Sequence, residues 1–394
     1  MKFPGLAPYD GARPCESNAG ALRIGIICHP TYGGSGVLAS ELALTLAERG
    51  HCVHLFSQNV PPRLARASGP VEMHVAQGFP YPLFQSPPHD LAITSEILTV
   101  HRSSGLDVLH AHYAIPHAVS GYLARAAAQT DPSRRAPKLI TTLHGTDITL
   151  VGSDPSYAPL TEFVIRQSDA VTAVSRDLAA RTQQAFPAIE RTVSVIHNFV
   201  DTVAFRPNTP PRTHAKPTVV HVSNFRPVKR VPWLIESFAR AARDLDARLV
   251  LVGDGPDMPA ARAAVRRCEL GERVVFLGER DALPELLSEA DVFALSSSEE
   301  SFGLSALEAM ACGTAVVATR AGGVAEVVQH EREGLLCEVD EQELFAAHLR
   351  RLLENRGEAR QLGLAGRERA VQQFERHQVV ARYETLYKQL VGRV

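Results

Sequence analysis

Short apolar runs alternate along most of the chain with longer segments in which apolar residues recur at helical spacing. The run at 23–29 leads through a glycine-rich turn into 37–49, where apolar residues fall on one helical face. Gly50 follows that segment, as glycine commonly follows a helix. Repeated strand–helix units of this kind predict a mostly parallel sheet covered on both faces.

The units form two consecutive series. The first predicts strands at 51–57, 71–75, 108–111, 138–143, 170–173 and 192–196, and helices at 91–103 and 118–128. The second predicts strands at 218–222, 247–252, 274–277, 291–295 and 315–319, and helices at 232–244, 259–268, 303–311 and within 341–394. We therefore expect an α/β protein with two Rossmann-like, doubly wound domains.

The boundary between the series is marked by residues 205–217, which contain four prolines and no apolar periodicity. A chain of 394 residues suits two domains of about 150–200 residues each. We expect an N-terminal domain at 21–205 and a C-terminal domain at 206–377, with a ligand cleft between them. Residues 1–20 are expected to be a disordered extension, and a helix at about 378–394 is a candidate for packing back on the first domain.

Composition excludes several functional classes. The net charge of −2 argues against a nucleic-acid binder. No apolar run approaches the roughly 18 residues of a membrane span, and the first twenty residues lack a signal-peptide core. The six cysteines are scattered, which indicates small buried side chains in a reducing compartment. We expect a soluble cytoplasmic protein without nucleic-acid or membrane partners, and a homo-oligomer is compatible with this sequence.

The first glycine-rich loop, TYGGSG at 31–36, joins a predicted strand to a helix. Its glycines permit close approach of a ligand, and the helix start favours negative charge. Read from Gly34, the segment fits a dinucleotide fingerprint, which also requires an acidic residue about 20 positions later. The chain has SQN at 57–59 instead, which disfavours a dehydrogenase. A tight turn that serves only packing is the alternative.

Polar side chains stand at the ends of two further predicted strands. His144 follows the strand at 138–143, with Asp147 close behind, and the sequence HAHY at 110–113 ends another strand. A lone histidine is often structural, but parallel sheets bind ligands at the carboxyl ends of their strands. His144 is therefore a functional candidate, whereas at least one histidine of HAHY is expected to fill the core.

Two motifs in the second series carry charge. Three cations lie within five residues at 226–230, directly after a strand, and predict an anion site. Glu300 precedes a predicted helix and Glu308 lies inside it, eight residues later. Carboxylates accept hydrogen bonds from sugar hydroxyls, and a helix start can hold phosphate. The alternatives are a solvated basic turn and, for Glu300, an ordinary surface acid.

The spacing of Glu300 and Glu308 in ESFGLSALEAMACGTAVVATRAGGVAEVV resembles the donor-binding signature of family-four retaining glycosyltransferases with the GT-B fold. Four other segments, CHPTYGGSGVLASELALTLAERGH, HAHYAIPHA, TTLHGTDITLVGSDPS and HVSNFRPVKRV, resemble the members of that family that act in bacillithiol biosynthesis. The resemblance runs from about Arg23 to the C-terminus. It implies transfer of N-acetylglucosamine from UDP-GlcNAc to the hydroxyl of L-malate, with retained configuration, released UDP, and no metal or cofactor.

The resemblance also implies residue roles. The catalytic set would be His144 near the reacting carbon, Arg226 and Lys229 on the diphosphate, and Glu300 on the hexose hydroxyls. Glu308 would bind the uridine ribose. Further donor contacts are implied for Gly34, Ser35, Asn224, Gly255, Arg280, Phe302, Gly303 and Leu304. Many relatives carry arginine where this chain has Asn224, so Arg226 takes over that role.

The two carboxylates of malate require cations or helix starts. We expect the acceptor to bind at Gly33, Gly34 and Arg63, with Tyr113 and Thr142 as hydroxyl donors. No carboxylate stands out as a nucleophile, so the hypothesis is front-face substitution, in which the leaving phosphate takes the acceptor proton. A related transferase with another donor, or with a lipid, sugar or phosphorylated acceptor, remains an alternative, as does a non-catalytic nucleotide-sugar-binding protein.

Overall fold

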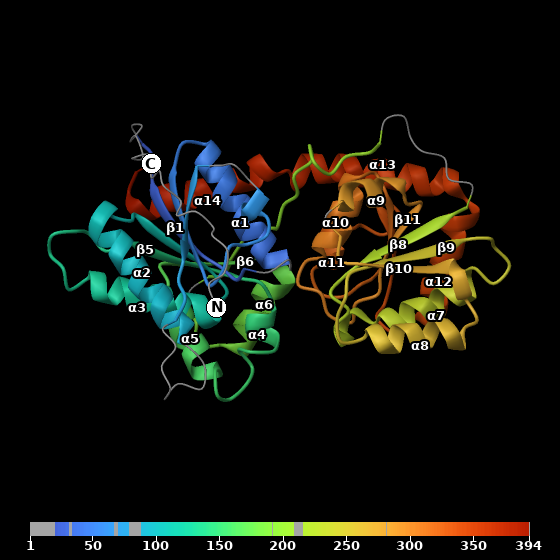
Figure 1. Cartoon of the computed structure of the whole chain (residues 1–394), viewed down its shortest axis with the longest axis horizontal. Coiled ribbons are helices and arrows are strands. Elements are labelled where there is room, and N and C mark those ends of the chain that lie inside the picture. The colour runs from blue at the N-terminus through green and yellow to red at the C-terminus, as the bar shows by residue number, and fades with distance from the viewer. Residues whose placement is uncertain are drawn as a thin grey trace, which may run out of the picture.

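The computed structural model of the protein describes residues 20–30, 34–66, 70–78, 88–190, 192–208, 216–280 and 282–393. These residues form two domains that lie side by side, each built on a parallel sheet with helices on both faces (Figure 1). The predicted α/β fold with two Rossmann-like domains is confirmed. The predicted extension falls almost wholly outside the described residues, as does Gly33.

The N-terminal sheet has the strand order β3-β2-β1-β4-β5-β6-β7, and all its strand pairs are parallel. Its strands are β1 (Arg23–Ile27), β2 (Cys52–Ser57), β3 (Val71–Val75), β4 (Val108–His112), β5 (Lys138–Leu143), β6 (Ala170–Ala173) and β7 (Ser194–Val195). Its helices are α1 (Gly34–Glu48), α2 (His89–Ser104), α3 (Val119–Ala128), α4 (Thr146–Thr149), α5 (Ala158–Gln167) and α6 (Arg176–Ala185). Strands such as β4 are buried along their whole length, because helices cover both faces.

The C-terminal sheet has the strand order β10-β9-β8-β11-β12-β13. Its strands are β8 (Thr218–Val222), β9 (Arg248–Val252), β10 (Val274–Gly278), β11 (Val292–Leu295), β12 (Ala315–Thr319) and β13 (Gly334–Cys337). Its helices are α7 (Val231–Ala241), α8 (Met258–Arg267), α9 (Leu283–Glu289), α10 (Leu304–Ala311), α11 (Val324–Val327), α12 (Gln342–Glu354) and α13 (Arg356–Gln373).

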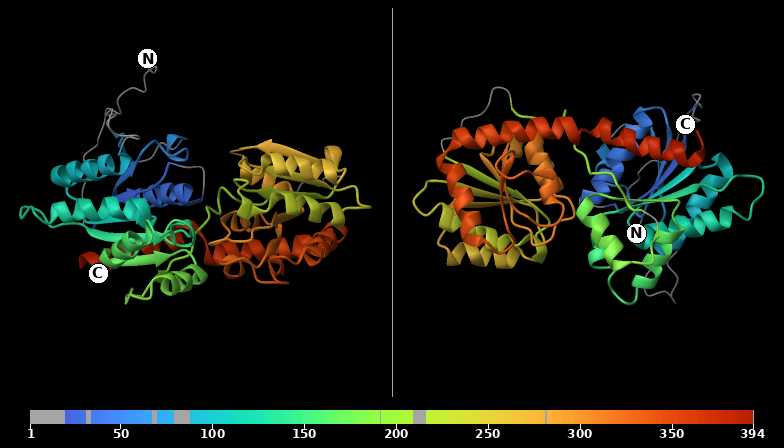
Figure 2. Two further views of the ribbon diagram at one scale, coloured as in Figure 1. Left: turned by 90° about the horizontal axis from the view of Figure 1, so that it is seen from below. Right: turned by 180° about the vertical axis from the view of Figure 1, so that it is seen from behind.

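The last helix, α14 (Arg376–Val391), leaves the C-terminal domain and packs against α1 on the N-terminal domain, as Figure 2 shows from behind. The chain thus crosses between the domains twice. The two crossings are hydrogen-bonded to each other, since Val200 N–H donates to Phe374 O at 2.9 Å and Arg376 N–H donates to Val200 O at 3.1 Å. Tyr387 of α14 reaches the N-terminal sheet, where its hydroxyl lies 2.7 Å from His110 Nδ1.

Two sequence-based expectations about surface and redox state have different outcomes. Across the ranges that the structure describes, no helix is long and apolar enough to cross a membrane. Cys28, Cys268, Cys312 and Cys337 carry free thiols, whereas Cys52 is disulfide-bonded. The expectation that every cysteine is simply a small buried side chain is therefore wrong at Cys52.

Candidate functional site

The loops of the candidate site lie at the point in each sheet where the strand order changes direction. β1 and β4 are neighbours in the N-terminal sheet, and β8 and β11 are neighbours in the C-terminal sheet. The connections that leave the two strands of each pair run to opposite sides of the sheet. This arrangement opens a crevice at the carboxyl ends of the strands. The sequences HAHY and HGTD lie at this end of the first sheet, and the residues 224–230 and 296–303 lie at this end of the second.

Two loops of the C-terminal domain are tied together by charge. Lys229 Nζ donates to Glu300 Oε2 at 2.6 Å, and Ser297 Oγ donates to the same oxygen at 3.2 Å. The backbone N–H of Ser298 donates to Val228 O at 2.8 Å. Both charged side chains of the pair are mostly buried. The structure thus pairs Lys229, which is expected to bind the diphosphate, with Glu300, which is expected to bind the hexose hydroxyls.

Arg226 belongs to the same loop and is exposed. Within the described part of the chain it forms no ion pair. The loop is held in an unusual backbone conformation, because Phe225 and Arg230 adopt φ values of 39° and 53°. Positive φ values cost free energy in residues other than glycine, and such strained residues are concentrated at functional sites.

The helix α10 begins at the same crevice without a side-chain cap. Its N-cap residue, Gly303, has a φ of 95°, which favours glycine, and the preceding Phe302 is buried. The first N–H groups of a helix have no partner within the helix and carry partial positive charge. The start of α10 therefore offers an anion-binding position beside the Lys229–Glu300 pair.

Glu308 lies on α10 and faces the other domain. Together with Leu304 it lines a small hollow that is completed by N-terminal residues, among them Glu41 and Arg63. Burial raises the pKa of Glu308 to about 7, and the charge of Arg63 opposes that shift. Arg63 also pairs with Glu41. The structure thus places Arg63 beside Glu308 and Glu41, and its role in binding the acceptor stays a prediction.

The N-terminal side of the crevice is built from buried histidines. His112 Nδ1 and His144 Nε2 are 3.0 Å apart, and His117 Nδ1 donates to the carbonyl of His112 at 2.7 Å. Burial lowers the pKa of His110, His117 and His144 to about 3, and that of His112 falls as well. These rings are therefore neutral at neutral pH, so they offer single hydrogen bonds rather than positive charge.

Asp147 fixes the backbone under His144. Its carboxylate is 1% exposed and accepts the N–H groups of Ala114, His144 and Gly145 at 2.9–3.1 Å. Burial raises its pKa to about 6. The sequence left the direction of this side chain open. The structure turns it into the backbone of the loop, so it is not placed as a nucleophile.

A glycine allows the two domains to touch at this point. A Cβ atom on Gly145, whose φ is 115°, would lie 1.7 Å from Ser301 Oγ. A Cβ on Gly34 at the start of α1 would lie 3.4 Å from Leu304 of α10. The loop of His144 therefore abuts the segment that follows Glu300. This contact brings the histidine cluster and the charged loops into one site.

Tyr113 sits between the two sides. Its phenol hydrogen-bonds to Ser35, and burial raises its pKa while the charge of Arg226 in the other domain acts against the shift. Its backbone φ of 86° marks a further strained residue at the site. Ser35, Tyr113 and Arg226 thus share one region of the cleft.

Three other predicted residues have different surroundings. Thr142 is buried, and its hydroxyl lies 2.6 Å from both His110 Nε2 and Thr172 Oγ1, so the structure does not favour a role in acceptor binding. A Cβ on Gly255 would lie 2.0 Å from Asn224 O, so this glycine lets a neighbouring loop pack against residues 224–230. Arg280 follows β10 at the sheet edge and is exposed.

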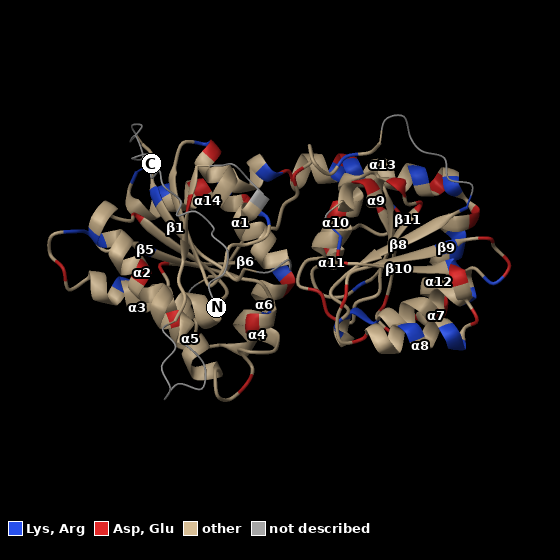
Figure 3. Ribbon diagram, in the orientation of Figure 1, with Lys and Arg blue, Asp and Glu red and all other residues tan. Residues whose placement is uncertain are grey.

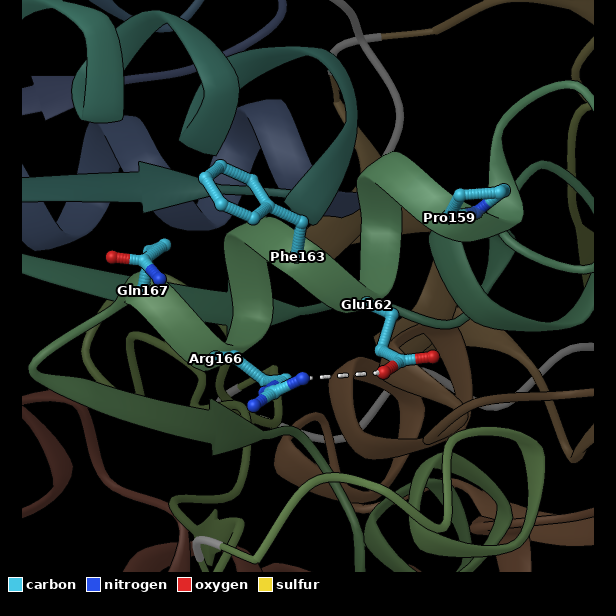
Figure 4. Close-up of a pocket in the computed structure, with 5 residues that line it drawn as sticks. All are labelled: Pro159, Glu162, Phe163, Arg166 and Gln167. Atoms are coloured by element: carbon cyan, nitrogen blue, oxygen red, sulfur yellow. Dashed lines mark ion pairs between the residues drawn. The ribbon is translucent and has the colours of Figure 1, made fainter.

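Charges of both signs lie on both domains (Figure 3). A separate hollow of about 400 Å³ lies on α5 and is lined by Pro159, Glu162, Phe163, Arg166 and Gln167 (Figure 4). Glu162 and Arg166 form an ion pair across it at 3.7 Å. None of these residues belongs to the cleft loops, so this hollow is not part of the site.

Some residues that hold the two domains in register do not stand out in the sequence. Glu326 of the C-terminal domain accepts the backbone N–H groups of Arg176 and Asp177, each at 3.0 Å, and lies 2.9 Å from His197 Nε2. Glu326 therefore caps the start of α6 from the opposite domain. Ser301 does not stand out either.

Comparisons with known proteins cover both domains. Residues 32–204 match the family described as Glycosyltransferase Family 4, and residues 206–369 match Glycosyl transferases group 1. The chain is 41% identical to N-acetyl-alpha-D-glucosaminyl L-malate synthase of Bacillus anthracis, over 93% of this chain and 96% of that protein. It is 31% identical to D-inositol 3-phosphate glycosyltransferase of Geodermatophilus obscurus, over 82% and 78% of the two chains. The fold is similar to that of sucrose-phosphate synthase from Thermosynechococcus elongatus, with a TM-score of 0.79 and 24% identity. The match covers 95% of this chain and 100% of that one.

Proposed function

The chain belongs to the family-four glycosyltransferases, and from this premise we propose that it transfers N-acetylglucosamine from UDP-GlcNAc to the hydroxyl of L-malate. The supporting observation is the contact of Gly145 with Ser301, which sets the neutral histidine cluster against the Lys229–Glu300 pair. We expect the diphosphate of a sugar donor to face the charged wall and the reacting carbon to face the histidine cluster. The donor and acceptor follow the name of the relative from Bacillus anthracis.

The C-terminal wall is proposed to hold the nucleotide diphosphate. Lys229, Arg226 and the uncapped start of α10 supply positive charge there. When phosphate binds, the ammonium of Lys229 is expected to turn toward it, which releases the Glu300 carboxylate to accept sugar hydroxyls. Glu308, at the far end of the same helix face, is expected to bind the ribose. Lys229, Arg226 and the start of α10 are proposed to neutralise the charge of the leaving diphosphate without a metal ion.

The N-terminal wall is proposed to hold the reacting carbon and the acceptor. His144 is neutral and its ring is fixed by His112, so it is expected to orient the sugar by a hydrogen bond. Because Asp147 is turned into the backbone, front-face substitution is the proposed route. The acceptor oxygen bonds to the anomeric carbon as the bond to the diphosphate breaks, and the departing phosphate oxygen takes the acceptor proton. We also propose the cytoplasm as the compartment, because Cys28, Cys268, Cys312 and Cys337 carry free thiols, while the disulfide-bonded Cys52 argues in the other direction.

The test is an acceptor panel. The purified protein is incubated with UDP-GlcNAc and EDTA, together with L-malate, D-malate, D-inositol 3-phosphate, or water alone, and UDP release is followed. The product is then examined by proton NMR for the configuration at the anomeric carbon. We expect rapid release with L-malate only, and an α-linked product.

Other outcomes reject defined parts of the proposal. Turnover with D-inositol 3-phosphate but not with L-malate would keep the donor site and discard the acceptor. Release that requires a divalent ion would reject charge neutralisation by side chains alone. Equal release in water and in L-malate would indicate hydrolysis of the donor instead of transfer.

A further inference from the structure

A second cluster of histidines and carboxylates lies on the N-terminal sheet, away from the cleft loops. It consists of His54 on β2, Glu72 and His74 on the edge strand β3, and Glu96 on α2. His54 and Glu72 are direct partners in the parallel pairing of the two strands. His54 is 2% exposed, so one member of the cluster is firmly built into the sheet.

The ligand atoms of three members converge. His54 Nδ1 lies 3.1 Å from His74 Nε2 and 3.4 Å from Glu72 Oε2, and His74 Nε2 lies 3.6 Å from Glu72 Oε1. In a tetrahedral zinc site with metal–ligand distances of about 2.0–2.2 Å, ligand atoms are roughly 3.3–3.6 Å apart. The separations of 3.4 and 3.6 Å match edges of such a site and run to the two different oxygens of the Glu72 carboxylate, whereas the 3.1 Å separation of the two ring nitrogens is shorter. Among the described residues, this is the one group of three whose histidine and carboxylate ligand atoms all lie within 4.8 Å of one another.

The fourth residue orients the site. Glu96 Oε1 lies 3.1 Å from His74 Nδ1, the ring nitrogen that points away from the cluster. A carboxylate in this position makes Nδ1 the protonated nitrogen, which leaves the lone pair of His74 Nε2 directed at the centre of the cluster. Histidine ligands of zinc have this arrangement, in which the second nitrogen donates to a carboxylate.

We propose that His54, Glu72 and His74 bind a divalent transition-metal ion, with zinc as the best fit, and that Glu96 is the residue that orients His74. Imidazole and carboxylate ligands suit zinc, and solvent at the half-exposed Glu72 would supply the fourth ligand. The ion would join the edge strand β3 to β2 and α2. Edge strands expose unpaired backbone groups, so such a link would stabilise the margin of the sheet. The proposal does not rest on glycosyl transfer.

The test measures metal binding directly. The full chain without a histidine tag is treated with EDTA, desalted, and titrated with zinc chloride by calorimetry, with metal content determined after dialysis. The cobalt-loaded protein is examined for the visible absorption of a four-coordinate ion. We expect one zinc ion per chain and a higher Tm with zinc than without it.

Variants assign the site. His74→Gln and Glu72→Gln should lose the bound ion, and Glu96→Gln should weaken binding by about 10–100-fold. His377→Gln, which changes an exposed histidine on α14, is the control and should bind zinc like the unaltered protein. Circular dichroism checks that each variant is folded, and Glu72→Gln, at a half-exposed position, keeps the test decisive if His74→Gln does not fold.

The proposal is overturned by either of two results. One is the absence of stoichiometric zinc in the unaltered protein, which would mean that the two rings and Glu72 share only hydrogen bonds. The other is zinc binding that persists in both Glu72→Gln and His74→Gln, which would place the ion elsewhere. Neither result would bear on the sugar-transfer proposal, because turnover is not the quantity measured.

Discussion

The two walls of the cleft use opposite electrostatic strategies. The N-terminal wall holds three buried imidazoles and the half-buried imidazole of His144, whose pKa values all lie far below neutrality, so it presents hydrogen bonds without charge. The C-terminal wall holds the Lys229–Glu300 pair, Arg226 and an uncapped helix start. A reaction that expels a diphosphate from a sugar needs charge on one side only. The difference separates stabilisation of the leaving group from positioning of the sugar.

The largest effect is expected from the charged wall. Lys229→Ala removes the cation proposed to stabilise the diphosphate, and kcat should fall by about 10²–10³-fold. The KM for L-malate should change little, because the acceptor is expected on the other wall. Steady-state kinetics with varied malate at saturating donor measures both. Lys216→Ala, which removes an exposed lysine paired with Asp246, is the control, and an unchanged kcat in Lys229→Ala would remove Lys229 from the mechanism.

The next difference concerns stability in acid. His110, His112, His117 and His144 have lowered pKa values, so the unfolded state binds more protons and stability falls as the pH drops below about 6.5. The raised pKa of Asp147 acts in the opposite direction, but on one group against four. In the other wall, the lowered pKa of His221 and the raised pKa of Glu308 oppose each other.

The N-terminal domain should therefore lose roughly 4 kcal/mol of stability between pH 7 and pH 5.5, whereas the C-terminal domain should change little. Hydrogen exchange with mass spectrometry, corrected for the intrinsic pH dependence, measures the two domains in one sample. The peptides of the C-terminal domain are the internal control. Equal loss of protection in both domains would contradict the contrast between the walls.

The contact between the walls can be tested at Gly145. In Gly145→Ala the new methyl group would clash with Ser301 and the backbone would be strained, so the domains should be held apart. A displacement of about 1 Å can reduce turnover up to 100-fold, and we expect a loss of that order. Kinetics and small-angle X-ray scattering measure turnover and opening. Gly271→Ala, at a φ of 51° with no atom within 4 Å, is the matched control.

If both glycine variants lost turnover equally, backbone strain would be responsible and contact between the walls would not. The second change Ser301→Gly gives a further check. It removes the side chain that the methyl group meets, so it should restore part of the lost turnover to Gly145→Ala and none to Gly271→Ala.

The smallest effect is expected within the histidine cluster. His112→Phe removes the hydrogen bond that fixes the ring of His144, and kcat should fall roughly tenfold with little change in the KM for UDP-GlcNAc. His112→Gln keeps a hydrogen-bonding group there and should recover part of the loss. A change in KM alone, or no difference between the two variants, would show that His112 serves packing only.

Much of the fold is predictable because strands of a covered parallel sheet are continuous apolar runs. The predicted bounds of β3, β5, β8 and β12 agree with the structure at both ends. The sequence does not predict the helix α6, because its sequence RDLAARTQQA is mostly polar and buries only Leu178 and Thr182. The start of α6 is capped by Glu326 from the other domain, and no local sequence pattern reveals this contact.

The site was predictable in its parts but not in its pairings. Glu300, Lys229 and His144 stand out because they follow strands, where ligands bind. That Lys229 pairs with Glu300 depends on two loops 71 residues apart, and that Gly145 meets Ser301 depends on the orientation of two domains. Asp147 and Thr142 lie next to conspicuous residues, yet their side chains turn into the protein. Sequence position alone does not determine that direction.

The return of α14 to the first domain has a consequence for how the protein is made. Tyr387 reaches His110, and Glu384 pairs with Arg49, so α14, which is synthesised after the whole C-terminal domain, completes the core of the N-terminal domain. The C-terminal domain is in effect inserted into the N-terminal one and is complete before α14 emerges. Domains usually fold in order of synthesis. Here, the N-terminal domain is expected to be completed after the C-terminal one, and a ribosome-bound nascent chain would display an uncovered face of α1 until α14 emerges.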